Sequence, residues 1–211
     1  MGVVFVAAAL LAAAGVQDAP GATTSQTAAC ELHVWPGSKL GSVYSGWTRG
    51  GIVNGAVTGR DGYPRTPADA INTREQAELL QAADLQNLLK LERYRVVMHP
   101  DALPSSVIRR TPIRIAASAT PCYAELIVDD VMMQHDDFAS GRFLKVLFRY
   151  REFGSDAAPV RSFGTWVQTR LVKFPPKLPE EEEEALAEMR QAFAKNITAF
   201  ATALHAPPKK R

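Results

Sequence analysis

The chain has 211 residues, and its 24 lysines and arginines against 22 aspartates and glutamates give a formal net charge of only +2. A charge this small does not indicate a nucleic-acid partner, which would call for a strongly basic surface. Beyond one apolar run at the N-terminus there is no second long apolar segment, and this excludes a polytopic membrane domain.

The N-terminal apolar run is typical of an export signal. Val3 to Val16 consists almost entirely of Val, Ala, Leu, Phe and Gly, and it is shorter than the about 20 apolar residues that cross a bilayer. We interpret residues 1–16 as a signal peptide or an N-terminal anchor, although no Lys or Arg precedes the run. Residues 17–29 have nothing to bury and predict a disordered spacer. The protein is therefore expected to be periplasmic or otherwise exported. Association with the outer membrane is one form of this location.

The two cysteines of the chain each open a short strand-like run, on the apolar side of that strand. Cys30 precedes the first expected strand, Glu31 to Trp35, and Cys122 opens a later one. In an exported domain this placement predicts one disulfide between neighbouring strands. Two alternatives stay open: Cys30 carries a lipid, although Thr27 stands where a lipoprotein normally has Leu, or both cysteines are buried free thiols.

The stretch from Gly37 to Gly62 holds eight of the fourteen glycines and predicts a long loop. It contains no glycine-rich phosphate-binding motif. Loops of this length are commonly functional or disordered, and aromatic side chains such as those in this one often anchor interfaces. We therefore expect the loop to contact a partner, or else to be a disordered insertion. The residues expected to make the contact are Tyr44, Trp47, Arg49 and Arg60.

A helix and a second strand are expected next. Thr73 and Gln76 have the spacing of a capping box, with Thr73 as the N-cap, and apolar residues at three- and four-residue spacing predict a helix to about residue 91. The run Tyr94 to Met98 predicts the second strand. Residues 101–121 contain three prolines and predict mostly loop.

Three more strands and a final helix complete the expected fold. The strands are 122–132, 142–153 and 162–174, and short polar connections favour antiparallel pairing. Pro179 and the acidic run 180–184 predict the start of a helix with an apolar stripe to Leu204. The fold class is therefore α+β, with a mixed sheet of about five strands in the order strand, helix, four strands, helix. Both helices are expected on one face of a single domain, residues 30–206, followed by a basic tail, residues 207–211.

The densest acidic cluster lies between residues 129 and 137, and the sequence offers no clear catalytic set. Four carboxylates and one imidazole in this cluster could bind a divalent ion, but a solvated hairpin end is the favoured interpretation. They are Asp129, Asp130, His135, Asp136 and Asp137. His33 and His99 have no nearby partner in the sequence, and no nucleophile elbow is present. We therefore expect no cofactor.

One face of the three-strand meander is basic. Its candidate binding residues are Lys145, Arg149, Arg151 and Arg170. Because neighbouring positions on paired strands lie about 5 Å apart, these side chains could form one patch for an anionic partner. The alternative is an ordinary solvated face, in which the arginines pair with Glu125 and Asp129 of the adjoining strand.

The order of elements resembles the amino-terminal domain of TolB and the related domains of the curli secretion lipoprotein and of lipoprotein activators of penicillin-binding proteins. In those domains a helix runs directly into the second strand, as Ala83 to Gln86 through Tyr94 to Val97 does here. The resemblance covers residues 30–204 as a pattern and transfers no motif residue. Residues 121–131 and 161–166 also look like segments of uncharacterised exported proteins of alphaproteobacteria, which implies an envelope location.

Three functions remain open from the sequence. The leading one is a non-catalytic, exported binding or docking module of the bacterial cell envelope, whose partner is an envelope protein or an anionic envelope component, with peripheral membrane association as one form. The second is a lipid-anchored accessory subunit of an envelope transport or assembly machine, tethered through Cys30. The third is a small hydrolase or metal-binding protein that uses the acidic hairpin 129–137.

Overall fold

The computed structural model describes residues 30–48, 51–56, 70–136, 141–154 and 157–207. The expected leader (1–16) and spacer (17–29), and all of the basic tail except Pro207, lie outside these ranges. None of the helices in the described ranges is both long and apolar enough to cross a membrane.

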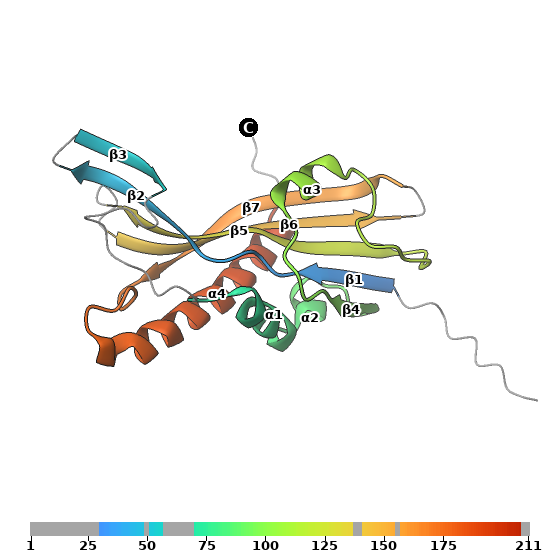
Figure 1. The fold of residues 1–211 in the computed structure, drawn as a ribbon. Coiled ribbons are helices and arrows are strands. Elements are labelled where there is room, and N and C mark those ends of the chain that lie inside the picture. The colour runs from blue at the N-terminus through green and yellow to red at the C-terminus, as the bar shows by residue number, and fades with distance from the viewer. Residues whose placement is uncertain (1–29, 49–50, 57–69, 137–140, 155–156, 208–211) are drawn as a thin grey trace, which may run out of the picture.

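The described chain folds into one mixed sheet with helices on both of its faces (Figure 1). This confirms the α+β class. Seven strands pair, two more than expected: β1 (Cys30–Trp35), β2 (Gly41–Thr48), β3 (Gly51–Ala56), β4 (Tyr94–Met98), β5 (Tyr123–Asp136), β6 (Gly141–Phe153) and β7 (Pro159–Leu171). β5, β6 and β7 form the expected antiparallel meander.

The strands β1 and β2 lie one after the other along the same side of β5. Both run parallel to it, β1 beside residues 123–127 and β2 beside residues 132–136. The parallel strand β4 then pairs with β1, and the antiparallel strand β3 pairs with β2. The sheet is therefore five positions wide but contains seven strands.

A buried glutamine holds the joint between β1 and β2. Gln76 is fully buried, and its Oε1 accepts a hydrogen bond from the Gly37 backbone N–H at 2.9 Å. Its Nε2 donates to the carbonyl oxygens of Ser38 (2.9 Å) and Ile71 (3.0 Å). A Cβ on residue 37 would lie only 2.8 Å from Gln76 Oε1 and from a Val128 methyl, so this position requires glycine.

The prediction of a loop from Gly37 to Gly62 is wrong for much of that stretch. Residues 41–48 and 51–56 are strands β2 and β3, joined as a hairpin. The glycines interrupt the alternation of apolar and polar side chains that identifies a strand. The partner of β2 is about ninety residues away in β5, so no local sequence pattern indicates this pairing. Residues 57–62 lie outside the described ranges.

The helix layer packs on one face of the sheet and forms the core with it (Figure 1). It consists of α1 (Thr73–Ala82), α2 (Leu85–Leu88) and, after the short 3₁₀ turn η1 (Pro179–Glu181), the long helix α4 (Glu182–His205). The expected single helix to residue 91 is broken at Ala83, which is extended, and Asp84 caps the new helix α2. The N-cap of α1 is Asn72 and not Thr73, because the Asn72 side chain accepts the Glu75 N–H.

A helix on the second face of the sheet was not expected. The helix α3 (Ser105–Arg110) lies on the opposite face of the sheet from α4 (Figure 1). With residues 111–116 it covers Trp35 and Ile127, which form a small second core. The two expected helical segments lie together on one face, as predicted, and α3 adds a helix on the other, so part of the face expected to be wet is covered.

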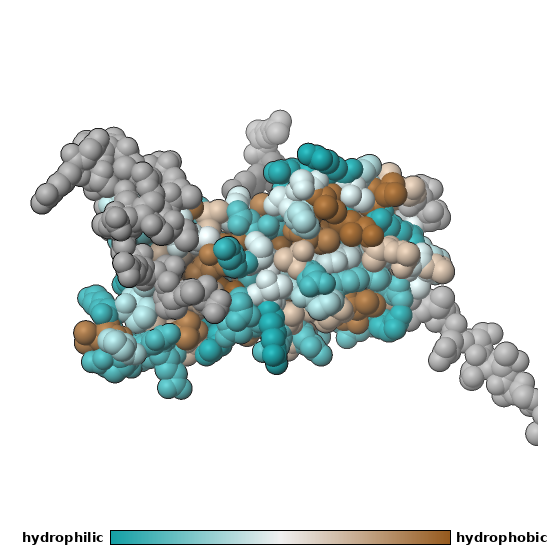
Figure 2. Space-filling view, in the orientation of Figure 1, coloured by the Kyte–Doolittle hydropathy of each residue, from teal (hydrophilic) through white to brown (hydrophobic). Residues whose placement is uncertain are grey.

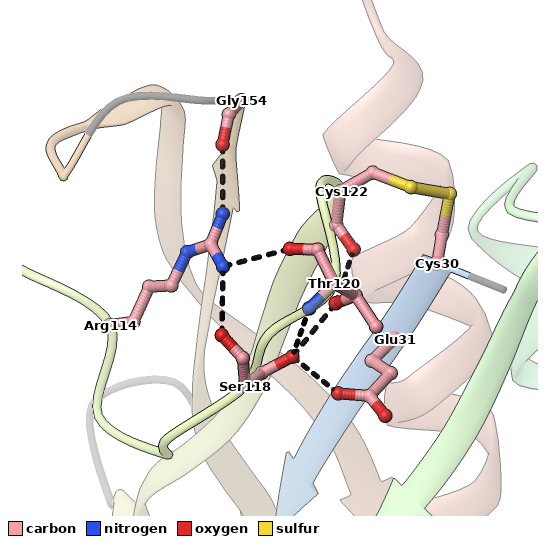
Figure 3. Close-up of a disulfide and its surroundings, with 7 residues drawn as sticks. All are labelled: Cys30, Glu31, Arg114, Ser118, Thr120, Cys122 and Gly154. Atoms are coloured by element: carbon pink, nitrogen blue, oxygen red, sulfur yellow. Dashed lines mark hydrogen bonds between the residues drawn. A yellow bond between two sulfur atoms is a disulfide. The ribbon is translucent and has the colours of Figure 1, made fainter. Parts of the chain in front are cut away.

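The predicted disulfide is confirmed. Cys30 and Cys122 are bonded across the start of β1 and β5, with Cα atoms 4.8 Å apart and a separation of 92 positions in sequence (Figure 3). The bond occupies the Cys30 sulfur, so in this state Cys30 cannot carry the thioether-linked lipid of the alternative interpretation.

Candidate functional site

The face of β5, β6 and β7 opposite α4, here called the outer face, carries the basic side chains expected from the sequence. Along β6, one set of alternating side chains is buried beneath α4, and the other set points to the outer face. A β-bulge between Val128 and Asp130 shifts the alternation in β5, so that Val131 and Met133 join the core. The buried set of β6 is Leu144, Val146, Phe148 and Tyr150.

Arg151 is a structural residue of the outer face. Its Nε donates to Glu125 Oε2 at 2.6 Å, and its Nη1 donates to the Thr111 carbonyl. Glu125 is fully buried and also accepts the Ile115 N–H (2.7 Å) and the Tyr123 hydroxyl (2.9 Å). Burial raises the pKa of that hydroxyl, so it remains a donor. The pair holds residues 111–115 over the sheet, and the interpretation of Arg151 as an exposed binding residue is replaced by the alternative pairing with Glu125.

Arg149 is paired but reaches solvent. Its Nε donates to Asp129 Oδ2 at 2.6 Å, and Asp129 also accepts the Ser105 hydroxyl of α3. The Asp129 side chain is almost fully buried, whereas 34% of the Arg149 side chain is exposed. The guanidinium of Arg149 lines a groove of about 370 Å³ between α3 and the strands β6 and β7.

Lys145 and Arg170 lie at the other end of the outer face, beside an exposed tryptophan. The Lys145 ammonium lies 5.9 Å from the centre of the Trp166 ring, a cation–π contact. Trp166 is 41% exposed, and Arg170 follows it on the same face of β7. Arg170 also lines an open cavity of about 680 Å³, with Arg142 of β6 beside it. Trp166 was missed from the sequence because an alternating strand gives no sign of which face is covered.

Of the four residues expected to bind through the glycine-rich stretch, only Tyr44 has a described side chain. Tyr44 is only 9% exposed, and its ring contacts His135 of β5 edge-on, with centroids 5.2 Å apart. This contact fixes β2 on β5. Trp47 belongs to β2, but its side chain lies outside the described part of the structure, as do Arg49 and Arg60.

The histidines His33 and His99 form a cluster that sequence reasoning missed. His33 is only 5% exposed. Its Nδ1 lies 2.9 Å from His99 Nε2, and its Nε2 lies 3.2 Å from Glu31 Oε2. Trp35 stacks on the His99 ring with centroids 4.1 Å apart. The signal was weak, since the two histidines are 66 residues apart and meet only because β4 is parallel to β1.

The polar groups around this cluster shift its protonation. The Ser118 hydroxyl, which donates to Glu31 at 2.6 Å (Figure 3), together with His33 and Arg95, lowers the pKa of Glu31 to about 2 against the desolvation caused by burial. Burial, and then the charge of His33, lowers the pKa of His99. Ser118 bonds to the carboxylate and not to an imidazole, so this is not the arrangement that activates a serine nucleophile.

The acidic stretch 129–137 does not gather into a metal site in the described residues. Asp129 is already bonded to Arg149 and Ser105. Asp130 is half-buried, and this burial raises the pKa of its carboxyl group. No three His, Cys, Asp or Glu side chains of the described chain come together as metal ligands. Asp137 lies outside the described ranges.

The surface around α3 combines charge with apolar side chains. Figure 2 shows apolar surface beside α3, with further apolar patches elsewhere in this view. Val107 of α3 and Ile113 of the following segment are 37% and 52% exposed. The outer face is thus polar and aromatic at the Trp166 end, and grooved and more apolar at the α3 end.

Comparison with known proteins gives distant structural matches only. No family model matches the chain, and no curated protein matches it either. Among solved structures, a candidate lipoprotein from Caulobacter crescentus aligns at 18% identity and a TM-score of 0.28, over 42% of this chain and 67% of that one. Lipoprotein GNA1162 from Neisseria meningitidis aligns at 8% identity and a TM-score of 0.31, over 79% and 99%. A hypothetical protein from Chlamydia trachomatis aligns at 7% and 0.37, over 85% and 100%.

These neighbours include lipoproteins and proteins without an assigned function. All three TM-scores are below 0.5, and the matches therefore assign no function to this chain.

Proposed function

We propose that this protein is a non-catalytic binding module of the bacterial cell envelope, which docks on an acidic protein partner through the outer face of β6 and β7. The observation that carries the proposal is Trp166, a large aromatic side chain 41% exposed on a sheet strand, with the Lys145 ammonium over its ring. Tryptophan and arginine are the residues most enriched at the energetic centres of interfaces.

The charges around Trp166 favour an anionic partner surface. Lys145 and Arg170 lie at one end of the outer face. Basic side chains at the rim of an interface speed association with an acidic surface and select against basic ones. The proposal therefore predicts an interface with Trp166 at its centre and a basic rim that makes binding sensitive to salt.

The compartment is supported by the disulfide. Disulfides such as Cys30–Cys122 persist in oxidising compartments and are rare in the cytosol. The order of the elements also resembles the amino-terminal domain of TolB and the curli secretion lipoprotein, both envelope proteins. The apolar leader expected from residues 1–16 agrees with this placement.

Photo-crosslinking from defined positions in intact cells tests the docking surface. A photo-reactive phenylalanine analogue at position 166 is expected to capture a discrete partner. The same analogue at position 191, an exposed residue of α4 on the other face of the molecule, is the matched control and is expected to capture none. Equal capture from both positions, or none from position 166, would contradict the proposal.

A further inference from the structure

The groove between α3 and β7 is lined by arginines and contains no acidic side chain among its described residues. It has a volume of about 370 Å³, and Arg109, Arg149 and Arg151 lie along it. The two carboxylates of this region, Asp129 and Glu125, are buried beneath it and already accept hydrogen bonds from Arg149 and Arg151. The groove therefore presents positive charge to solvent with the balancing carboxylates behind it.

Donor groups of two arginines remain available in the groove. Arg149 uses Nε for Asp129, and its two terminal nitrogens make no hydrogen bond within the described residues. Arg109 is exposed in the last turn of α3 and has no ion pair with a described residue. The hydroxyl of Ser162, exposed on β7, lines the same groove. Two guanidinium groups and a hydroxyl offer more donors than the two oxygens of a carboxylate can accept.

Gly164 leaves the Arg149 guanidinium uncovered. It lies in the middle of β7, directly across the strand pair from Arg149. A Cβ at position 164 would lie 3.5 Å from Arg149 Cγ and 3.7 Å from Nη1, so any side chain there would rest on the arginine. Glycine weakens a strand and often marks a place where a ligand approaches closely. Steric need of the fold does not explain this glycine, because a Cβ fits at ordinary contact distances.

We propose that this groove binds a phosphate group, held by Arg149, Arg109 and Ser162, with Gly164 keeping the approach to Arg149 open. A tetrahedral phosphate has enough acceptor oxygens for all three side chains, and the planar guanidinium group matches phosphate oxygens in pairs. The phosphate is either free, as inorganic phosphate or on a small solute, or is the headgroup phosphate of an anionic lipid. Trp166 does not line this groove, and the proposal does not depend on the docking surface.

The first test is a titration of the full chain with inorganic phosphate at constant ionic strength, followed through the amide resonances of residues 162 and 164. Saturable shifts of these resonances are expected. Arg109→Gln is expected to weaken binding about tenfold, the usual effect of removing one charge-assisted hydrogen bond. Equal affinity for acetate and phosphate, or no saturable shift, would overturn the proposal.

The sharper test is Gly164→Val, which covers Arg149 without removing any donor. Valine favours strands, so the variant is expected to be at least as stable as the wild type and yet to lose phosphate binding. Gln168→Val is the matched control: residue 168 is exposed on the same face of β7, outside the groove, and this variant is expected to bind normally. Unchanged phosphate affinity in Gly164→Val would show that the groove is not the site.

Vesicles identify the source of the phosphate. The full chain is sedimented with vesicles of phosphatidylcholine alone and with vesicles that also contain phosphatidic acid. The N-terminal apolar run is common to all variants, so only differences between variants report on the groove. Binding to phosphatidic acid that is lost in Gly164→Val and kept in Gln168→Val supports a lipid headgroup. Binding of inorganic phosphate without this difference on vesicles supports a free phosphate.

Discussion

Among single residues, the half-buried imidazole of His99 carries the clearest expectation about pH. It packs against Trp35 and His33, with Glu31, Arg95 and Tyr123 around the cluster. Burial lowers its pKa below the ordinary value of 6.5, so as pH falls the unfolded chain binds a proton at this position before the folded protein does. Its contribution to stability is therefore present above about pH 6.5 and lost below it.

We expect the melting temperature of the wild type to fall between about pH 7.5 and pH 5.5, across the ordinary pKa of histidine. His99→Gln, which keeps a side-chain hydrogen-bond donor but does not titrate, is expected to show a smaller fall. Thermal unfolding of both proteins at the two pH values measures the difference. An identical fall in both would assign the pH dependence to another group.

The stability of the protein is expected to depend strongly on both members of the buried pair, Arg151 and Glu125. Arg151→Met leaves the Glu125 carboxylate buried without its cation and is expected to cost about 3–5 kcal/mol. Adding Glu125→Gln to this variant removes the uncompensated charge and keeps an acceptor for the Ile115 N–H, so much of the loss is expected to return. Urea unfolding of the two single variants and the double variant measures the coupling. Strictly additive losses would mean that the two side chains act independently.

Among the elements, α4 is the largest single contributor to the core. Its apolar stripe packs on the buried residues of β6 and β7, and Phe193, fully buried, contacts the ring of Phe148. Buried Asn196 ties the helix to the sheet by donating to the Leu144 carbonyl and accepting the Thr169 hydroxyl. The helix is thus held by both packing and hydrogen bonds.

Phe193→Ala is expected to destabilise the protein by about 3–5 kcal/mol, the usual cost of truncating a fully buried phenylalanine. Gln191→Ala, at an exposed position of the same helix, is the control and is expected to change stability little. Chemical denaturation of both variants checks this. A Phe193→Ala variant that unfolds with the wild type would show that α4 does not pack on the sheet.

The elements also show which parts of the fold can be predicted from the sequence. The meander β5–β7 and the helix α4 were predicted because their apolar spacing is regular and their partners are adjacent in the chain. The strand β2 was missed because its glycines hide its alternation and its partner is β5. The break before α2 was missed because the apolar stripe continues across it. Only Asp84, which caps α2, marks the start of a new helix.

The candidate site was less predictable than the fold. Lys145, Arg149 and Arg151 all occupy positions on the same face of β6, so the sequence pattern does not distinguish them. Only the position of α3 decides that Arg151 is buried while Lys145 is not. That position depends on contacts of α3 with β5, such as the bond from Ser105 to Asp129. Neither Trp166 nor Gly164 carries a sequence signal of its own. Their roles depend on the neighbouring strand that lies across from each of them.

At the scale of the whole molecule, the disulfide links the first described strand to the centre of the sheet. Cys30 and Cys122 are 92 residues apart in sequence, and closing a loop of that length stabilises a protein by about 4–5 kcal/mol at most in the chain-entropy model. We expect a variant with both cysteines replaced by alanine to fold but to lose part of this free energy. Non-reducing peptide mapping of the wild type, with both thiols found free in protein recovered from the periplasm, would remove the basis of this prediction.

The end-to-end arrangement of β1 and β2 divides one side of the sheet into two parts that can open separately. The β1 part is held by the disulfide, by β4 and by the small core under α3, whereas β2 is held by β5 and the hairpin strand β3, with the Gly37–Gln76 bond at the joint. Local opening of native proteins follows such units. Amide hydrogens of β2 are therefore expected to exchange with solvent deuterium much faster than those of Leu32 to Val34. Equal exchange rates in the two strands would mean that the side of the sheet opens as one cooperative unit.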